Sequence, residues 1–221
     1  MSLLGFDTST AASSACVLRS DGQAFEVAPP AGRLMRPPAH ASELMPAVED
    51  VMTRAGLDWP ELEAIAVGVG PGAFTGLRIG VTTARALAHA AGLPLRPVSS
   101  LAALAAGVDA GERLAVIDAK RGEVFALLEG AGVSGWKPEA LTPEALAERV
   151  RACGTIPLAV GDGSVRFRQV LETAGITVAP DDAGAHVVRG LHVCRLAQGV
   201  ADEPPEAVLP DYLRAPDAKP Q

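Results

Sequence analysis

Residues 64–80 read AIAVGVGPGAFTGLRIG, and no other stretch of this chain says more about its fold. The apolar run from Ala64 to Val69 breaks into a glycine-rich loop, which leads directly into a helix-forming segment. Glycine lets backbone N–H groups approach an anion closely, and the start of a helix carries partial positive charge. The pattern therefore predicts a strand, a glycine loop and a helix, in the order typical of nucleotide-binding folds.

The glycine loop lacks the residues that complete the standard phosphate-binding motifs. A Walker A loop continues with Lys and then Ser or Thr, whereas Gly76 is followed by Leu77 and Arg78. A dinucleotide fingerprint needs an acidic residue about 20 positions further on, and no Asp or Glu occurs between Ala64 and Val108. Two interpretations stay open: a residual anion site, or a tight strand-to-helix turn that uses glycine only for close packing.

Length and composition narrow the class of protein. A chain of 221 residues suits one large domain or two small lobes. Because 48% of the residues are hydrophobic and only 4% are aromatic, we expect a core of Ala, Val and Leu. The formal net charge of −7 argues against a protein that binds nucleic acid unaided, since such binding depends on basic side chains meeting phosphates.

Cysteines and histidines indicate neither a disulfide scaffold nor a metal site. Cys16, Cys153 and Cys194 stand far apart with no C-x-x-C pair, so we expect buried free thiols. The four histidines show no metal-binding spacing. The segment from Met1 to Asp7 has no basic region before its apolar run, and no stretch approaches the roughly 18 apolar residues of a membrane helix. We expect a cytoplasmic protein.

The chain contains an internal duplication. A strand ending in aspartate, Leu3 to Asp7, is repeated at Leu114 to Asp118, and each is followed by a second apolar strand. The run at 66–70 is echoed at 159–163, and each run opens a helical segment. Hairpins followed by crossover helices give mixed sheets covered by helices. We therefore expect an α/β fold of two related lobes, with the first at residues 1–106 and the second at 107–221.

Two helices are predicted in the first lobe. From Ser42 to Ala55, apolar residues recur at helical spacing between charged positions, and Gly56 supplies a stop. The second helix, from about Thr75 to Ala91, is small and apolar nearly all round. Ordinary core packing is one interpretation of both helices, and a surface for another subunit is the other. Both can hold together.

Several motifs spread along the whole chain resemble one known family, the TsaB (YeaZ) family. The most specific is the Gly-Pro-Gly-Ala-Phe-Thr-Gly-Leu-Arg run, together with the Val-Ser-Ser-Leu that follows it. The matching segments are Leu4 to Thr10 (LGFDTST), His40 to Pro46 (HASELMP), Gly70 to Gly80 (GPGAFTGLRIG), Pro97 to Leu101 (PVSSL), Ile117 to Ala119 (IDA) and Pro210 to Arg214 (PDYLR).

The resemblance implies an actin-like ATPase fold, related to ribonuclease H, in two lobes, with a C-terminal segment that could pack back on the first lobe. Members of this family are bacterial partners of TsaD, which transfers a threonylcarbamoyl group to N6 of adenosine 37 in tRNAs that read codons beginning with A. An ATPase, TsaE, joins them. TsaB acts as a scaffold and homodimerises when alone through first-lobe helices that also meet TsaD. The resemblance thus implies contact with tRNA only through the complex, and no membrane partner.

The sequence also offers a reason for a lack of catalysis. TsaD-like relatives carry a His-x-x-x-His metal pair where this chain has Ser100 and Leu104, which cannot hold that metal. We therefore predict a catalytically inactive relative of TsaD that requires no cofactor, with weak ATP or ADP binding left open. The alternatives are a glycoprotease-like (M22) metallopeptidase or a nucleotide phosphohydrolase using Asp7 and Asp118, and, less compatible with the charge, a stand-alone tRNA binder.

Two groups of residues are the candidate sites. A vestigial nucleotide site is predicted at Asp7, Thr8, Ser9, Gly70, Gly72, Thr75 and Gly76. A partner interface is predicted at Leu44, Met45, Val48, Val51, Met52, Arg78 and Arg85.

Overall fold

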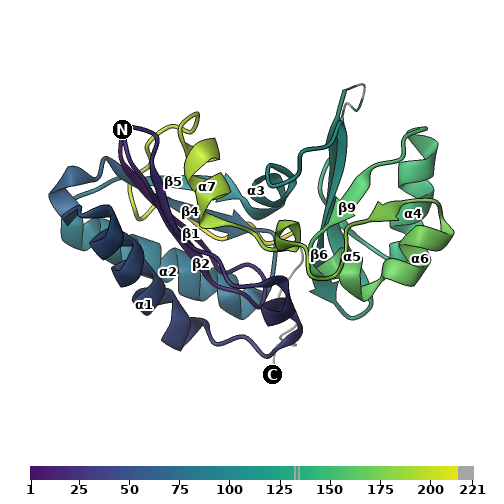
Figure 1. Cartoon of the computed structure of the whole chain (residues 1–221), viewed down its shortest axis with the longest axis horizontal. Helices are drawn as coiled ribbons and strands as arrows, with labels where there is room; N and C mark the ends of the chain where they lie inside the picture. Colours follow the sequence, from purple (N-terminus) through teal and green to yellow (C-terminus); the bar gives the residue numbers. More distant parts are fainter. Residues whose placement is uncertain (132, 134, 214–221) are drawn as a thin grey trace.

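The computed structural model describes residues 1–131, 133 and 135–213, which form two five-stranded sheets with helices packed on both (Figure 1). The last eight residues of the predicted second lobe, 214–221, lie outside the described residues. The first sheet has the order β3-β2-β1-β4-β5, with β1 (Leu3–Asp7), β2 (Ser14–Leu18), β3 (Ala24–Val27), β4 (Ala64–Gly70) and β5 (Leu95–Ser99). The second has the order β10-β9-β6-β7-β8, with β6 (Glu112–Lys120), β7 (Glu123–Gly130), β8 (Ala140–Leu141), β9 (Leu158–Val160) and β10 (Thr177–Val178).

Helices and short 3-10 turns connect these strands. The helices are α1 (His40–Ala55), α2 (Phe74–Ala91), α3 (Ser100–Ala105), α4 (Pro143–Ala152), α5 (Asp162–Arg166), α6 (Arg168–Thr173) and α7 (Gly190–Ala197). The 3-10 turns are η1 (Ala31–Met35), η2 (Trp59–Glu61) and η3 (Gly184–His186).

The two sheets share one topology. In the first, β1 pairs antiparallel with β2 and parallel with β4. In the second, β6 pairs antiparallel with β7 and parallel with β9, so β6 takes the place of β1. The outer strands repeat the same relationship, since β3 and β8 are antiparallel to their neighbours while β5 and β10 are parallel to theirs. The predicted duplication and two-lobed α/β fold are confirmed, and this is the actin-like fold expected from the motifs.

Helices α1 and α2 cover the outer face of the first sheet (Figure 1). Helix α1 begins at His40, two residues before the predicted start, and ends where Gly56 adopts a left-handed conformation (φ 61°). Helix α2 begins at Phe74, one residue earlier than predicted, and ends at Gly92 in the same conformation (φ 67°). The apolar face of α1 packs with Phe6 and Ile65 of the sheet, as the helical spacing predicted.

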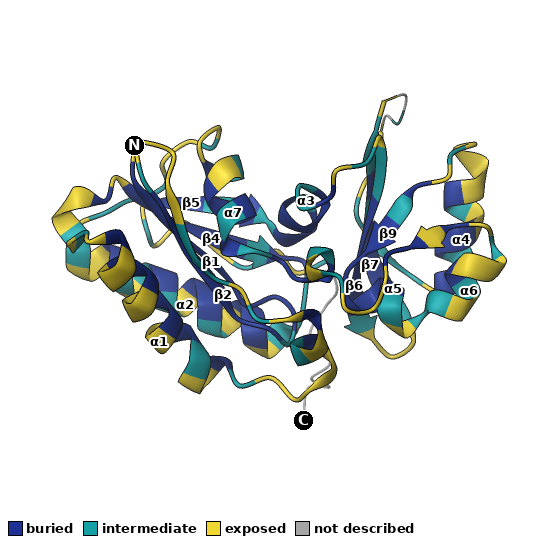
Figure 2. Cartoon of the chain, in the orientation of Figure 1, coloured by how far each residue is buried: buried dark blue, intermediate teal, exposed yellow. Residues whose placement is uncertain are grey.

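Helix α3 contacts both sheets, and helix α7 packs on the first sheet beside α3. Helix α7 follows the last strand of the second sheet but packs on β1 and β2 of the first, and α3 follows β5 but also contacts β6 and β7. Most residues of both helices are buried, and α3 lies in the middle of the molecule (Figure 2). Gly5 on β1 permits this close packing, because a Cβ there would lie 2.5 Å from the Sγ atom of Cys194 on α7.

The cysteines correct one expectation. Cys16 and Cys194 are buried free thiols as predicted, but Cys153 is free and exposed, because it follows the last turn of α4 at the surface. In the part of the chain that the structure describes, no helix combines the length and the apolar character needed to cross a bilayer.

Candidate functional site

Asp7, the last residue of β1, is the centre of the candidate site and is buried. Its Oδ1 accepts hydrogen bonds from the backbone N–H of Ser9 (2.7 Å) and from the Ser9 hydroxyl (2.6 Å). Its Oδ2 accepts a hydrogen bond from the hydroxyl of Ser100 (2.6 Å), at the start of α3. Both carboxyl oxygens are thus bound by groups of the protein itself.

Burial raises the pKa of the Asp7 carboxyl above its ordinary value, since water is excluded from the charged form. The hydrogen bonds from Ser100 and Ser9, and the nearby His40, act in the opposite direction by stabilising the carboxylate, but burial is the largest cause. The site therefore favours a neutral carboxyl more than an exposed aspartate does.

The glycine loop packs directly on the residues that follow Asp7. The Thr8 hydroxyl donates a hydrogen bond to the carbonyl oxygen of Gly76 (2.8 Å), and the N–H of Ala73 donates to the carbonyl oxygen of Ser9 (2.7 Å). A Cβ on Gly72 would lie 2.4 Å from the carbonyl oxygen of Ser9. One on Gly76 would lie 2.1 Å from that of Thr8. Glycine is required here by the approach of the protein's own backbone.

Six of the seven residues of the predicted nucleotide site therefore come together, and Thr75 lies apart, on the exposed side of α2. The N–H of Gly70 donates a hydrogen bond to Ser100 Oγ (3.2 Å). Together with the N–H of Ala73, two N–H groups of the loop therefore donate to acceptors of the protein itself. This geometry favours the second interpretation of the loop, a tight turn built for close packing.

The prediction missed the contribution of Ser100. The sequence indicated only that Ser100 replaces a metal-binding histidine, whereas the structure makes its hydroxyl the link between Asp7 and the glycine loop. The Ser99-Ser100 pair could have indicated the start of a helix at this point, because serine is favoured at the N-cap. Ser99 is the N-cap of α3 and accepts a hydrogen bond from the N–H of Ala102 (3.3 Å). Leu104, at the second histidine position, is buried in the core between the sheets.

The second lobe holds an equivalent aspartate, Asp118 in β6, which is bound by cationic side chains. Its Oδ2 accepts hydrogen bonds from Lys120 Nζ (2.9 Å) and Arg166 Nη1 (2.9 Å), and its Oδ1 accepts from the N–H of Lys120 (2.8 Å). Asp162, at the start of α5, accepts from the N–H of Asp118 (3.0 Å), and burial raises the pKa of the Asp162 carboxyl. In the described residues, no three His, Cys, Asp or Glu side chains lie close enough to hold a metal ion.

The predicted partner residues divide into a buried and an exposed group. Leu44, Val48, Val51 and Met52 are buried against the first sheet, so their apolar spacing reflects the core. Met45 remains 42% exposed, Arg78 is exposed and Arg85 is half-buried. Val48 and Met52 reach the surface only as lining of a hollow of about 490 Å³, which Met45 and Trp59 also line.

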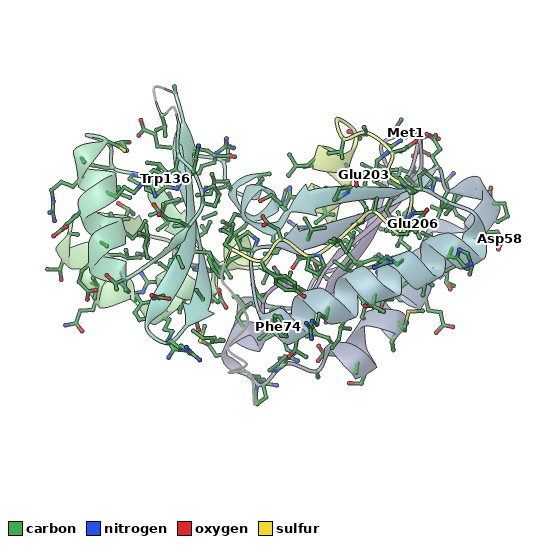
Figure 3. The ribbon with its side chains drawn as sticks, turned by 180° about the vertical axis from the view of Figure 1, so that it is seen from behind. Met1, Asp58, Phe74, Trp136, Glu203 and Glu206 are labelled. Carbon is green, nitrogen blue, oxygen red and sulfur yellow. The ribbon has the colours of Figure 1, made fainter. Side chains whose placement is uncertain are left out.

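Arg78 belongs to an aromatic cluster with the C-terminal segment. Its guanidinium lies 3.8 Å from the ring centroid of Phe74, at the start of α2, and its Nε donates to the hydroxyl of Tyr212 (3.1 Å). The two aromatic rings lie 5.1 Å apart. Figure 3 shows Phe74 at the end of α2 that faces the second lobe.

Comparison with known proteins finds relatives whose descriptions agree with one another. The family model described as TsaD, tRNA N6-adenosine threonylcarbamoyltransferase, matches residues 37–146. The chain is 35% identical over 190 residues to the tRNA threonylcarbamoyladenosine biosynthesis protein TsaB of Escherichia coli K12, covering 80% of this chain and 78% of that protein. Over 129 residues it is 35% identical to the protein of the same name from Haemophilus influenzae, covering 57% of this chain and 52% of that one.

Solved structures agree with these relatives. The chain superposes on YeaZ from Pseudomonas aeruginosa with a TM-score of 0.75 and 26% identity, covering 96% of this chain and 99% of that one. A second structure, of an uncharacterized Pseudomonas aeruginosa protein with similarity to peptidase YeaZ, gives a TM-score of 0.79 and 28% identity with the same coverage.

Proposed function

Because the chain belongs to the TsaB family, we propose that it is a non-catalytic scaffold subunit of the bacterial tRNA N6-threonylcarbamoyladenosine modification complex. It binds a TsaD subunit and activates it for transfer of threonylcarbamoyl to adenosine 37 of tRNAs that read codons beginning with A. TsaE joins through the complex, and tRNA contacts this chain only within it. Without partners the chain forms a homodimer, and its place of action is the cytoplasm.

The proposal rests on one observation, that groups of the protein itself fill the site around Asp7. Both oxygens of the carboxyl are occupied by hydroxyl and N–H donors from Ser9 and Ser100. The neighbouring glycine loop is filled by the backbone of Thr8 and Ser9. A carboxylate that served as a metal ligand or a general base would need a free oxygen facing a substrate.

The second aspartate supports the same conclusion. Asp118 is held by Lys120 and Arg166, which neutralise its charge in place of a divalent cation. Neither aspartate of the duplicated fold therefore offers the open carboxylate that a phosphohydrolase or metallopeptidase would use. For the same reason, we propose that the chain requires no cofactor.

The exposed parts of α1 and α2 are the proposed partner surface. Met45 stands beside the hollow lined by Val48 and Met52, and α2 exposes a line of residues at helical spacing, Arg78, Thr82 and Ala86. Small and flexible side chains of this kind suit close packing against a second helix. The four buried residues of the predicted interface support this surface from beneath.

Reconstitution tests the proposed function. The chain is mixed with its TsaD and TsaE, tRNA, ATP and the threonylcarbamoyl donor system, and modified adenosine is measured with the wild-type chain or with Asp7→Asn. A scaffold predicts the same yield for both, provided that circular dichroism shows Asp7→Asn to be folded. ATP turnover by the isolated chain that disappears in Asp7→Asn would instead support the phosphohydrolase.

A further inference from the structure

Arg78 on α2 is an exposed cation whose guanidinium is held in one orientation. The group lies 3.8 Å from the ring centroid of Phe74, one turn earlier on the helix, and its Nε donates to the Tyr212 hydroxyl (3.1 Å). The rings of Phe74 and Tyr212 also contact each other, at the end of α2 that Figure 3 labels with Phe74. An exposed arginine ordinarily samples many rotamers, and these contacts restrict that freedom.

The C-terminal segment that carries Tyr212 is itself fixed to the rest of the molecule. The Val208 side chain is buried in the core of the first lobe. The N–H of Asp211 donates to the carbonyl oxygen of Val69 in β4 (2.7 Å), and Leu213 packs against the core between the sheets. Because the residues on both sides of Tyr212 are anchored, its hydroxyl is presented to α2 at a fixed place.

The outer end of the Arg78 guanidinium is open. Among the residues that the structure describes, no hydrogen bond or ion pair occupies its Nη1 or Nη2. Arg33 shows a completed arrangement in the same chain, since its Nε and Nη2 each donate to one carboxyl oxygen of Glu43 (3.0 Å for both). Parallel donors of a planar guanidinium match the two oxygens of a carboxylate, and a guanidinium that is already oriented loses less freedom on binding.

Helix α2 presents a basic stripe on an acidic protein. Its 18 residues contain no Asp or Glu, whereas the whole chain has a formal net charge of −7. Arg78, Arg85 and His89 stand at positions i, i+7 and i+11, which lie on one side of a helix. Thr82 and Ala86 between them are exposed and small, so another helix can approach closely. The stripe therefore complements an acidic protein surface.

We propose, resting on the scaffold function above, that Arg78 binds a carboxylate of the TsaD subunit through Nη1 and Nη2, and that Tyr212 is the positioning residue that orients it. An acidic segment of TsaD then packs along α2. A protein is favoured over the phosphates of tRNA, because the small side chains of α2 and the exposed Met45 of α1 suit apolar packing. Two copies of this chain that met through α2 would place like charges together.

Isothermal titration calorimetry of the full chain with its TsaD tests the carboxylate contact. Arg78→Met keeps an apolar side chain over Phe74 but removes the guanidinium, and should weaken association at least about tenfold. Arg78→Lys keeps the charge without the planar fork, so its affinity should lie between those of the wild type and Arg78→Met. Arg151→Met, at an exposed arginine of α4, is the control and should bind as the wild type does. Equal affinity for Arg78→Met and the wild type overturns the proposal.

A double-mutant cycle tests the role of Tyr212. Tyr212→Phe keeps the ring beside Phe74 and removes only the hydroxyl that binds Arg78. It should weaken association with TsaD about threefold in the wild-type chain. In the Arg78→Met chain the same change should have no effect, because no guanidinium remains to be oriented. An equal loss in both backgrounds would show that Tyr212 acts without Arg78, and would contradict its positioning role.

Two further measurements identify what covers the stripe. Sedimentation of the chain alone reports self-association, and a loss in Arg78→Met as large as the loss of TsaD binding would assign the stripe to a second copy and contradict the proposal. Binding of tRNA by the chain alone that depends on Arg78 would assign the stripe to phosphates, with the same consequence. A wild-type chain that does not bind TsaD would overturn the scaffold function itself, which separates that failure from the failure of the carboxylate contact.

Discussion

The hydroxyl of Ser100 donates a 2.6 Å hydrogen bond to Oδ2 of Asp7 and accepts one from the N–H of Gly70 (3.2 Å). One side chain thereby connects the end of β1, the glycine loop and the start of α3. In TsaD-like relatives, the family resemblance places a metal-binding histidine at this position. In this chain the Ser100 hydroxyl makes a structural contact between Asp7 and the glycine loop.

Replacing Ser100 by alanine should destabilise the protein. The change leaves Oδ2 of Asp7 and the N–H of Gly70 buried without their partner, at a cost of about 1–3 kcal/mol in the free energy of unfolding. Urea denaturation measures it, and Ser42→Ala, an exposed serine on α1, is the matched control. Equal stability of the two variants would show that the Ser100 contacts do not matter.

The raised pKa of Asp7 predicts a specific dependence of stability on pH. The native state holds the Asp7 proton up to a higher pH than the unfolded state, whose pKa is near the ordinary 3.8. Between these two pKa values the native state binds more protons, so stability falls as pH rises and increases on acidification. The contribution of this carboxyl is greatest below the unfolded pKa and is lost above the native one.

Asp7→Asn isolates that contribution, because asparagine does not titrate. The free energy of unfolding of the wild type minus that of Asp7→Asn should increase as the pH is lowered from 7 toward 4, by at most about 1.4 kcal/mol per pH unit. Other titrating groups are common to both proteins and largely cancel in the difference. Denaturant unfolding at several pH values measures it, and a difference that decreases on acidification contradicts the assignment.

Gly76→Ala should be strongly destabilising even though alanine favours helices. Helix propensity gains about 1 kcal/mol, but the new Cβ would lie 2.1 Å from the carbonyl oxygen of Thr8, which is backbone and cannot rotate away. Overpacking of this kind costs more than the gain, so we expect a net loss of at least about 2 kcal/mol. Gly111→Ala is the control, because no atom lies within 4 Å of its Cβ position. Thermal unfolding distinguishes the two variants, and similar melting temperatures would be inconsistent with the packed loop.

Met45→Asp should weaken partner association without unfolding the chain. Met45 is 42% exposed, so the substitution should change the free energy of unfolding by no more than about 0.5 kcal/mol. A carboxylate buried against an apolar partner should weaken association with TsaD at least about tenfold. Sedimentation measures it, with Gln169→Asp on exposed α6 as the control. Unchanged association would remove α1 from the interface.

Val48→Asp does not serve the same purpose. Val48 is 1% exposed in the core beneath the first sheet, so a charge there is expected to unfold the lobe whether or not the helix meets a partner. Loss of association in that variant would therefore carry no information about the interface.

The local pattern of the sequence was sufficient to predict the main strands and helices and their duplication. Both aspartate-terminated strands, both strand-Gly-x-Gly segments and the two first-lobe helices were predicted within two residues, because spacing of apolar residues and glycine stops act over a few positions. The same local pattern could not separate core from interface on α1. An apolar stripe looks identical whether it meets a sheet or another subunit.

The sequence by itself determined a duplicated α/β chain in which a glycine loop meets the end of the first strand, since these features rest on short-range periodicity and on residue types. Tertiary structure alone decided that α3 contacts both sheets, that α7 packs on the first sheet, and that Ser100 binds Asp7. Those contacts join residues distant along the chain. They depend on how whole elements pack, which no local pattern encodes.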